Sequence, residues 1–385
     1  MASYRFAIEA VTPLFLGGAK QSQAELRAPS IKGALRFWFR AMMGEDLLKE
    51  RSSATEDKES RLFGSTNHKS AVVLRVGNLT GSQQNLANLG QELGYLGYGA
   101  LAYEKDTKSF KATRPCYEPQ TEFTLTAEVS DDRSLRLDFL RSLWLLCNLG
   151  GLGSRSRRGF GSLQVIRVEP QNEAFLAVTT ADTPAALKAR LEQGLRAVFQ
   201  DQHPSQRPLP CFSAITGTSG IYVYHQDFPS WQEALKAIGG RMQDYRLRGP
   251  RSSATSHGES DYDKVRRFLD TGIIHDPPLR AAFGLPHNYY FSSRAKEKRW
   301  PWKASFSGER HDRRASPLLI HVTRLASSRF AVVLTYLKAR FLEQGESIEA
   351  RAGDTSAFVG QPAHTAISEF ISHLGLSDEW KVRLP

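Results

Sequence analysis

Residues 150–161 read Gly150-Gly151-Leu152-Gly153-Ser154-Arg155-Ser156-Arg157-Arg158-Gly159-Phe160-Gly161, and this stretch decides the fold. Five of its twelve residues are glycine and three are arginine. Glycine allows backbone conformations and close approaches that a side chain hinders, and arginine presents a planar, permanently charged fork that matches phosphate oxygens. The stretch therefore predicts a loop that lies against an anionic polymer. The alternative is a glycine-rich connector with solvated arginines.

The flanks of this loop predict a helix before it and a strand after it. Apolar residues recur at helical spacing over 134–149, with Ser134 as a candidate N-cap, and residues 162–169 have strand composition. A dinucleotide-binding fingerprint requires the opposite order, strand, glycine loop and helix, and a Walker loop requires Gly-Lys-Ser/Thr at a helix start. We therefore expect no nucleotide cofactor.

Composition narrows the class of protein. The 385 residues suffice for two or three domains, and 51 Lys+Arg against 40 Asp+Glu give a net charge of +11, which favours a nucleic-acid partner. The cysteines Cys116, Cys147 and Cys211 are far apart, so neither a disulfide framework nor a structural zinc site is expected. No apolar run approaches the ~20 residues that span a bilayer. We expect a cytoplasmic protein with no membrane contact.

The order of predicted elements indicates the fold class. Strands are expected at 4–10, 71–76, 123–129 and 162–169, with helices at 30–43 and 134–149. This strand, helix, strand, strand, helix, strand order is the ferredoxin-like βαββαβ arrangement, an α+β fold. Residues 77–120 contain an insertion that the pattern does not place.

The helix predicted at 30–43 carries a basic stripe. Lys32, Arg36 and Arg40 recur at four-residue steps, and Lys32 lies in the first turn, where the helix dipole favours acids. That unfavourable placement suggests that the cation faces a negative partner. A solvated basic stripe on an amphipathic helix explains the pattern equally well.

Three stretches resemble a known family. They are Thr12–Gly18 with Leu26–Ala41, the glycine/arginine loop, and Ala281–Pro286 with Tyr289-Tyr290 and Arg314–Leu318. Together they resemble the RAMP superfamily of CRISPR–Cas proteins, and more narrowly the first-numbered RAMP subunits of type III-B (Cmr) effector complexes. The resemblance extends from near the N-terminus to about residue 340.

The resemblance implies an architecture and a set of partners. It implies two ferredoxin-like RAMP domains with insertions, which we place at 1–170 and 211–385 with a linker at 171–210. It also implies a non-catalytic RNA-binding subunit that contacts guide RNA, target RNA or both, beside other RAMP subunits. The RNA-binding residues that it implies are Arg27, Ser30, Lys32, Arg36, Gly151, Gly153, Arg155, Arg157, Arg158 and Gly161.

Two segments receive no role from the resemblance. The charged, serine-rich residues 45–61 are expected to form a surface loop. Residues 294–314 carry eight Lys/Arg against three acids, together with Trp300 and Trp302. Neither segment matches a motif of the family.

The sequence offers little support for catalysis. A metal-independent ribonuclease needs a general acid and base, most often histidine, and only His68 lies in the first 200 residues. His311-Asp312 is a weak metal-ligand signal, and no acid pair indicates a two-metal site. We therefore predict a non-enzymatic protein without a metal or cofactor. The alternatives are a guide-processing endoribonuclease of the same superfamily and a basic scaffold for acidic protein partners.

Overall fold

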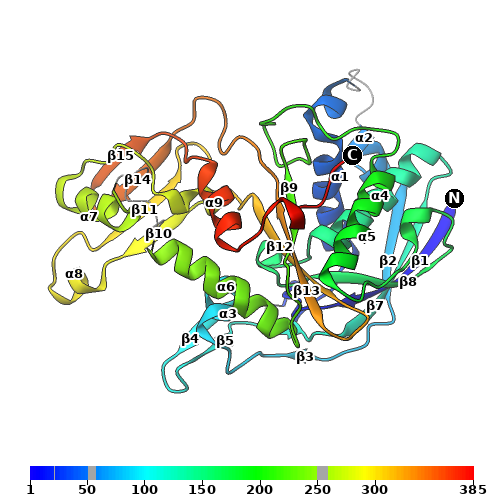
Figure 1. Cartoon of the computed structure of the whole chain (residues 1–385), viewed down its shortest axis with the longest axis horizontal. Coiled ribbons are helices and arrows are strands. Elements are labelled where there is room, and N and C mark those ends of the chain that lie inside the picture. The colour runs from blue at the N-terminus through cyan, green and yellow to red at the C-terminus, as the bar shows by residue number, and fades with distance from the viewer. Residues whose placement is uncertain (21, 51–57, 249–258) are drawn as a thin grey trace. The chain divides into compact units, whose positions relative to one another are not determined.

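The computed structural model describes residues 1–20, 22–50, 58–248 and 259–385 (Figure 1). The chain forms two compact units. Unit 1 comprises Met1–Gly240, Leu319–Lys338 and Leu376–Pro385, and unit 2 comprises Arg241–Leu318 and Ala339–Gly375. Each unit therefore contains segments that are distant in the sequence.

The first sheet of unit 1 has the predicted topology. Its strands are β1 (Ala2–Ala10), β2 (Val72–Gly77), β7 (Thr121–Val129) and β8 (Leu163–Glu169), in the order β2-β7-β1-β8. All neighbours are antiparallel. Numbered along the βαββαβ chain, this order is 2-3-1-4, as in a ferredoxin-like sheet. The α+β prediction is confirmed.

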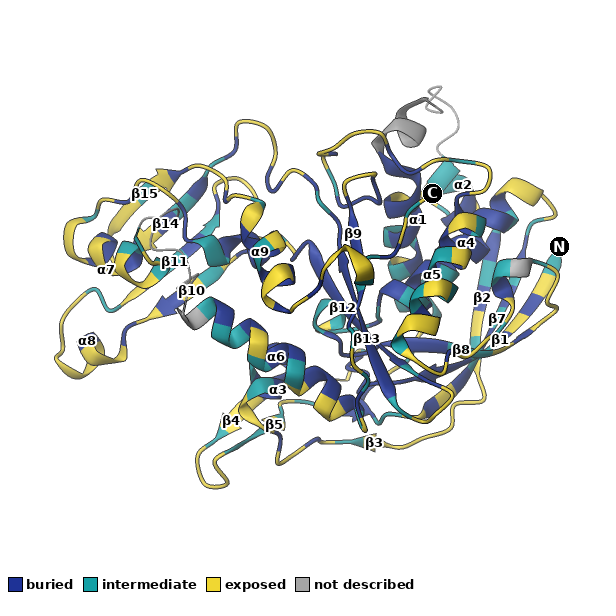
Figure 2. Cartoon of the chain, viewed as in Figure 1, coloured by how far each residue is buried: buried dark blue, intermediate teal, exposed yellow. Residues whose placement is uncertain are grey.

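Two helices cover one face of this sheet. They are α1 (Ala28–Glu50) and α4 (Arg133–Leu149), which pack against each other and against the buried side chains of β1 (Figures 1 and 2). In β1 the alternate residues Tyr4, Phe6 and Ile8 are buried, because successive side chains of a strand point to opposite faces. The helices therefore supply the apolar layer that the sheet requires.

Both helix starts differ from the prediction. Asp132, rather than Ser134, caps α4, because its carboxylate accepts the backbone N–H groups of Ser134 (2.9 Å) and Leu135 (3.2 Å). Helix α1 begins at Ala28, two residues before the predicted start, so Ser30 lies inside its first turn. After a kink at the non-helical Gly44 (φ 64°), the helix runs on to Glu50, where a surface loop was expected, and α2 (Lys58–Phe63) follows. Residues 51–57 of that predicted loop lie outside the described residues.

The insertion between β2 and β7 consists of short elements. It forms two small antiparallel ribbons, β3 with β6 and β4 with β5, beside one short helix. The elements are β3 (Gln83–Gln84), α3 (Gln91–Leu96), β4 (Leu101–Glu104), β5 (Ser109–Ala112) and β6 (Cys116–Tyr117). None of them joins the first sheet.

A second sheet in unit 1 repeats the order of the first. Its strands β9 (Gly220–Val223), β12 (Leu318–Arg324) and β13 (Phe330–Tyr336) lie in the order β12-β13-β9. On the free edge of β9, Tyr222 forms a bridge with Lys381. Helix α6 (Trp231–Arg248) follows β9 as α1 follows β1. This is again the order 2-3-1-4, with the fourth strand reduced to one bridge.

The compact units do not follow the linear boundaries predicted at residues 170 and 211. Helix α5 (Pro184–Val198) falls in the predicted linker, yet its Leu187, Leu191 and Leu195 are buried in the unit 1 core. Strands β9 and β13 contribute to the same core. Apolar burial therefore joins the linker and the second sheet to the first domain.

Unit 2 is built around a third sheet. The segments that form this sheet are inserted into the βαββαβ order of the second sheet at two places, before β12 and after β13. The third sheet's strands β10 (His287–Tyr290), β11 (Lys303–Gly308), β14 (Ile348–Ala352) and β15 (Thr355–Val359) are antiparallel and lie in that order. The helices α7 (Asp261–Thr271), α8 (Ser292–Lys296) and α9 (Thr365–His373) also lie in unit 2. Among the described residues of both units, the 3-10 helices are Ser156–Arg158, Ala174–Leu176, Leu279–Phe283 and Asp378–Trp380. Among the described residues, no helix is both long and apolar enough to cross a membrane.

A buried histidine joins the second sheet of unit 1 to the start of the glycine/arginine loop. His321 on β12 is fully buried, and its Nδ1 donates to the carbonyl of Gly150 at 2.6 Å. Nearby, Val322 N–H donates to Ser162 Oγ at 3.0 Å, and Arg324 N–H donates to Gln164 Oε1 at 3.0 Å. Burial lowers the pKa of His321 to about 4, which keeps the ring neutral.

We expect His321 to make the stability of the protein depend on pH. An unfolded histidine takes up a proton near pH 6.5, whereas the folded one does so near pH 4, so stability is full above about 6.5 and falls as the pH drops toward 4. The loss from this group is about 3 kcal/mol. Urea unfolding between pH 4 and 7 should show a shallower pH dependence for His321→Asn than for the wild type. His68→Asn is the control, and an unchanged dependence in His321→Asn would contradict the assignment.

Candidate nucleic-acid interface

The glycine/arginine loop is a compact, hydrogen-bonded structure. Leu152 N–H donates to the carbonyl of Gly161 at 2.8 Å, which closes the loop. Ser154 N–H donates to the carbonyl of Phe15 at 2.8 Å, and Gly161 N–H donates to that of Pro13 at 2.9 Å. The loop therefore lies directly on the segment that follows β1, and the structure brings together two of the stretches identified in the sequence.

The glycines serve this internal contact. Gly153 (φ 85°) and Gly161 (φ 65°) have left-handed backbones, and a Cβ at either position would overlap a backbone carbonyl oxygen, that of Phe15 or of Leu152. A Cβ at Gly151 would lie 3.1 Å from the Gly161 carbonyl oxygen. At these three positions the protein's own backbone therefore occupies the space beside the glycine. The RNA contact of the glycines stays a prediction.

The predicted contacts from α1 are also internal. Lys32 Nζ donates to Ser70 Oγ (3.0 Å) and to the carbonyl of Val72 (3.1 Å), and burial, followed by repulsion from Arg36, lowers the pKa of Lys32. Arg36 forms an ion pair with Glu59 at 3.0 Å and donates to the carbonyl of Gly64. The negative partner expected for Lys32 is therefore a set of oxygens at the start of β2. Phosphate binding by either residue would have to compete with these bonds.

Arg27 and Ser30 lie at the start of α1. Arg27 is exposed, with its Nε 3.8 Å from a carboxylate oxygen of Glu25. Ser30 is partly exposed, and its backbone N–H donates to the carbonyl of Arg27 at 3.0 Å. Such a long, exposed ion pair contributes little to stability, so Arg27 can exchange its partner at small cost.

The three loop arginines have different surroundings. The guanidinium of Arg157 lies 4.8 Å from the centroid of the Phe37 ring, a cation–π contact with α1. Arg158 closes the 3-10 turn, because its N–H donates to the carbonyl of Arg155 at 2.8 Å. Arg155 is exposed, and among the described residues it forms no ion pair. Of the three, Arg155 is therefore the best placed to meet a ligand.

A polar groove of about 620 Å³ lies between the segment after β1 and the insertion. At Gly17 the wall is low, because no atom lies within 4 Å of an added Cβ, whereas the side chain of Glu25 lies against Gly18. Arg114 contributes a cation. The guanidinium of Arg155 reaches its wall, because a Cβ at Gly99 would lie 3.0 Å from Arg155 Nη2. The full lining is Leu16, Gly17, Gly18, Ser22, Gln23, Gly99, Thr113, Arg114 and Pro115.

The two arginines at this groove form an electropositive pair. Arg114 Nη2 donates to Ser154 Oγ at 2.6 Å, while its Nε is buried without a hydrogen-bond partner. Although Arg155 as a residue is exposed, partial desolvation of its guanidinium lowers its pKa; the nearby Tyr98 opposes that shift, and repulsion from Arg114 adds to it. Among the described residues no carboxylate pairs with either guanidinium. An anion in the groove would relieve this repulsion.

Arg114 and Ser154 are not among the RNA-binding residues that the resemblance implies. Arg114 lies in the insertion between β2 and β7, which the sequence pattern does not place. No periodicity marks it, and only the fold brings it to Ser154, 40 positions later.

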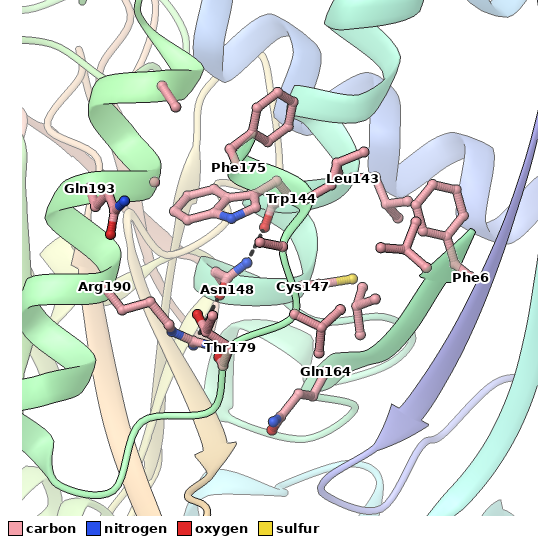
Figure 3. Close-up of a pocket in the computed structure, with 17 residues that line it drawn as sticks. Phe6, Leu143, Trp144, Cys147, Asn148, Gln164, Phe175, Thr179, Arg190 and Gln193 are labelled. Carbon is pink, nitrogen blue, oxygen red and sulfur yellow. Dashed lines mark hydrogen bonds between the residues drawn. The ribbon is translucent and has the colours of Figure 1, made fainter. Parts of the chain in front are cut away.

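A second, apolar cavity of about 150 Å³ lies between α4, α5 and β8 (Figure 3). Trp144 and Phe175 line it, together with the thiol of Cys147, whose pKa burial raises to about 12. At its edge Arg190 donates to the carbonyl of Thr179 at 2.6 Å and to Asn148 Oδ1 at 3.2 Å. We interpret this cavity as a packing gap in the core.

His311, a weak metal-ligand signal in the sequence, has a structural role. His311, Glu343 and Glu346 lie close together in unit 2. The buried carboxylate of Glu346 accepts the backbone N–H groups of Arg310 (3.1 Å) and His311 (2.8 Å), and also contacts His311 Nδ1 at 3.1 Å. The cluster therefore anchors the loop after β11.

Comparisons with known proteins agree with this architecture. Residues 7–164 match the RAMP superfamily. The chain is 32% identical over 176 residues to the Cmr subunit Cmr1-2 of Pyrococcus furiosus, covering 42% of this chain and 93% of that protein. It is 25% identical over 346 residues to Cmr1-1 of the same organism, covering 87% and 88%.

The chain belongs to the RAMP superfamily. Its fold resembles the crystal structure of Cmr1 from Pyrococcus furiosus in its apo form, with a TM-score of 0.58 and 22% identity over 99% of both chains. It also resembles a chain in the cryo-EM structure of the type III-B Cmr-beta complex bound to cognate target RNA, with a TM-score of 0.52 and 13% identity over 97% of this chain and 98% of that one. At these identities the two structures support the fold alone.

In this RAMP protein, Gly153→Ala should strongly destabilise the loop. The new Cβ would overlap the Phe15 carbonyl oxygen in addition to straining a left-handed backbone. Gly375→Ala is the matched control, because Gly375 has φ 74° but no atom within 4 Å of the added Cβ. We expect Gly153→Ala to lose about 1–3 kcal/mol more than the control in denaturant unfolding, as overpacking generally costs. Equal losses of unfolding free energy in the two variants would mean that the overlap with the Phe15 carbonyl does not contribute to the destabilisation.

Proposed function

We propose that this chain is a non-catalytic RNA-binding subunit of a type III-B CRISPR effector complex. The observation that carries the proposal is the groove with Arg114 and Arg155 at its wall and no carboxylate paired with either one among the described residues. The net charge of +11 supports the same class of partner.

The groove suits a ribose-phosphate backbone. Guanidinium groups bind phosphate oxygens with two parallel hydrogen bonds, and the low wall at Gly17 lets a polymer backbone approach closely. Contacts of this kind position a strand without reading its sequence. Binding should therefore depend little on base identity. Arg27, Ser30, Arg157 and Arg158 are proposed as flanking contacts, and Lys32 and Arg36 as supports of α1.

The relatives support a role within an assembly. Both curated relatives are named as Cmr subunits, and one solved structure of the same fold comes from a Cmr-beta complex bound to target RNA. We propose that this chain likewise contacts other RAMP subunits in the cytoplasm. Guide RNA and target RNA offer the same phosphate chemistry to the groove, and crosslinking in an assembled complex distinguishes them.

The lining of the groove favours binding over cleavage. None of the residues that line it is His, Asp or Glu, the side chains that most often move protons in a metal-independent ribonuclease. His68 is held elsewhere, in the turn after α2, where its N–H donates to Ser65 Oγ. The alternative, a guide-processing endoribonuclease, lacks a comparable structural observation in its favour.

Replacing Arg114 and Arg155 by alanine should weaken RNA binding and make it less dependent on salt. Each phosphate contact on a single strand contributes about 0.7 to the slope of log affinity against log salt concentration, so the double variant should lose up to about 1.4. Affinities for a uridine homopolymer and for a mixed sequence, measured at several salt concentrations, should change by the same factor.

Arg75→Ala is the control for loss of a surface charge, because Arg75 lies on β2 and pairs with Glu128. Arg114→Lys keeps the charge and should retain part of the affinity, which separates charge from folding. If the double variant binds RNA as tightly as Arg75→Ala at every salt concentration, the groove is not the RNA site.

The purified chain should bind RNA without cutting it. Incubation of end-labelled guide RNA with the protein in EDTA should leave the RNA intact over hours, because no acid–base pair lines the groove. Defined fragments that disappear in a single histidine variant would instead support the endoribonuclease. A binding measurement on the same sample shows that the protein is folded.

A further inference from the structure

The sheet of unit 2 has one buried face and one exposed face. On the inner face Tyr289, Phe306 and Ala350 are buried against Phe268 of α7. On the outer face Asn288 and Tyr290 of β10 are exposed, as is Lys303 of β11. Helix α8, which follows β10, is also largely exposed (Figure 2). Among the described residues of unit 2, no element covers this outer face.

Aromatic side chains gather at one end of the outer face. The rings of Tyr290 and Trp300 are 62% and 59% exposed, although large aromatic side chains normally bury most of their surface. Tyr290 lies directly opposite Lys303 in the β10–β11 pair, and its ring centroid is 6.1 Å from that of Trp302. Trp300 lies against Gly353 in the turn between β14 and β15. We call Tyr290, Trp300, Trp302 and Lys303 the aromatic end.

Cations surround the aromatic end. Lys303 Nζ lies 5.9 Å from the centroid of the Trp302 ring. Residues 294–303 carry five Lys/Arg against one acid. Arg294 and Arg299 share Asp270, whereas among the described residues Lys296, Lys298 and Lys303 form no ion pair. The surface therefore offers exposed rings beside three lysines that form no ion pair with a described residue.

We propose that the aromatic end is a second binding site for single-stranded RNA. Exposed rings on an open antiparallel sheet stack with bases, and lysines beside them hold the phosphates between successive bases. A protein partner fits less well, because the cores of protein interfaces are depleted of lysine. The site lies in unit 2 and uses none of the groove residues. It therefore goes beyond the proposed function and gives a role to the basic, tryptophan-containing segment 294–303.

The test uses the full chain with Arg114→Ala and Arg155→Ala in place, so that the groove does not contribute. The probe is a 5-iodouridine hexanucleotide, and the readouts are its affinity and the peptide to which it crosslinks. We expect crosslinks to Tyr290 or Trp300. Adding Trp300→Ala or Tyr290→Ala should weaken binding roughly 5- to 150-fold, the usual range for one stacked base. Trp300→Phe should retain most of the affinity.

Phe358→Ala is the matched control. Phe358 lies on the outer face of the same sheet and is 58% exposed, but its cross-strand neighbour is Glu349, which pairs with Arg351. Its loss should leave binding unchanged. Thermal melting of each variant reports folding, and the exposed positions of these rings predict wild-type melting.

Several results would overturn the proposal. Absence of crosslinks to the aromatic end would do so, as would equal losses in Phe358→Ala and Tyr290→Ala. Aromatic variants that bind the probe normally but no longer assemble with other Cmr subunits would assign the surface to a protein partner. Crosslinks to the aromatic end, combined with groove variants of unchanged affinity, would instead support this site while rejecting the groove.

Discussion

The close packing of two backbone segments, 12–16 and 152–162, is the constraint on which the site depends. Thr12 Oγ1 donates to the carbonyl of Gly159 at 2.7 Å and accepts the N–H of Ser162 at 2.9 Å, so the two segments are joined by side-chain as well as backbone bonds. Side chains at Gly153 or Gly161 would separate them. Because this contact holds the loop in place, Ser154 can receive Arg114 and Arg155 can face the groove.

The basic residues of the chain divide into those that support the fold and those that remain available. Lys32 and Arg36 hold α1 against β2 and α2, and Arg324 binds the buried carboxylate of Glu9 beside the second sheet. Arg114 and Arg155 have no such acid partner among the described residues. A net positive charge therefore does not identify an interface by itself. The proposed interface instead rests on Arg114 and Arg155, the groove guanidinium groups that have no paired carboxylate among the described residues.

The elements of the first domain were predictable from the sequence, whereas the partners of individual side chains were not. The βαββαβ order followed from periodicities of two and 3.6 residues, which depend only on local burial. The basic stripe of α1 suggested a negative partner for Lys32, but the partner proved to be Ser70 and Val72, whose proximity depends on tertiary packing. Arg114 could not be found, because its groove is formed by segments about 100 residues apart. The burial of Leu187, Leu191 and Leu195 in the predicted linker could not be found for the same reason, since it depends on segments that are distant in the sequence.

The tandem architecture explains how one chain carries two separate cationic surfaces. In the first βαββαβ unit the insertion lies between the second and third strands and supplies one wall of the groove. In the second βαββαβ repeat the insertions fall before β12 and after β13, and together they form the third sheet. Connections between strands can grow without disturbing the sheet core, because each doubling of loop length costs only about 0.6 kcal/mol of closure free energy. Inserted residues therefore form one wall of the groove and the whole of the aromatic end, while the repeated sheets supply the buried scaffold that positions them.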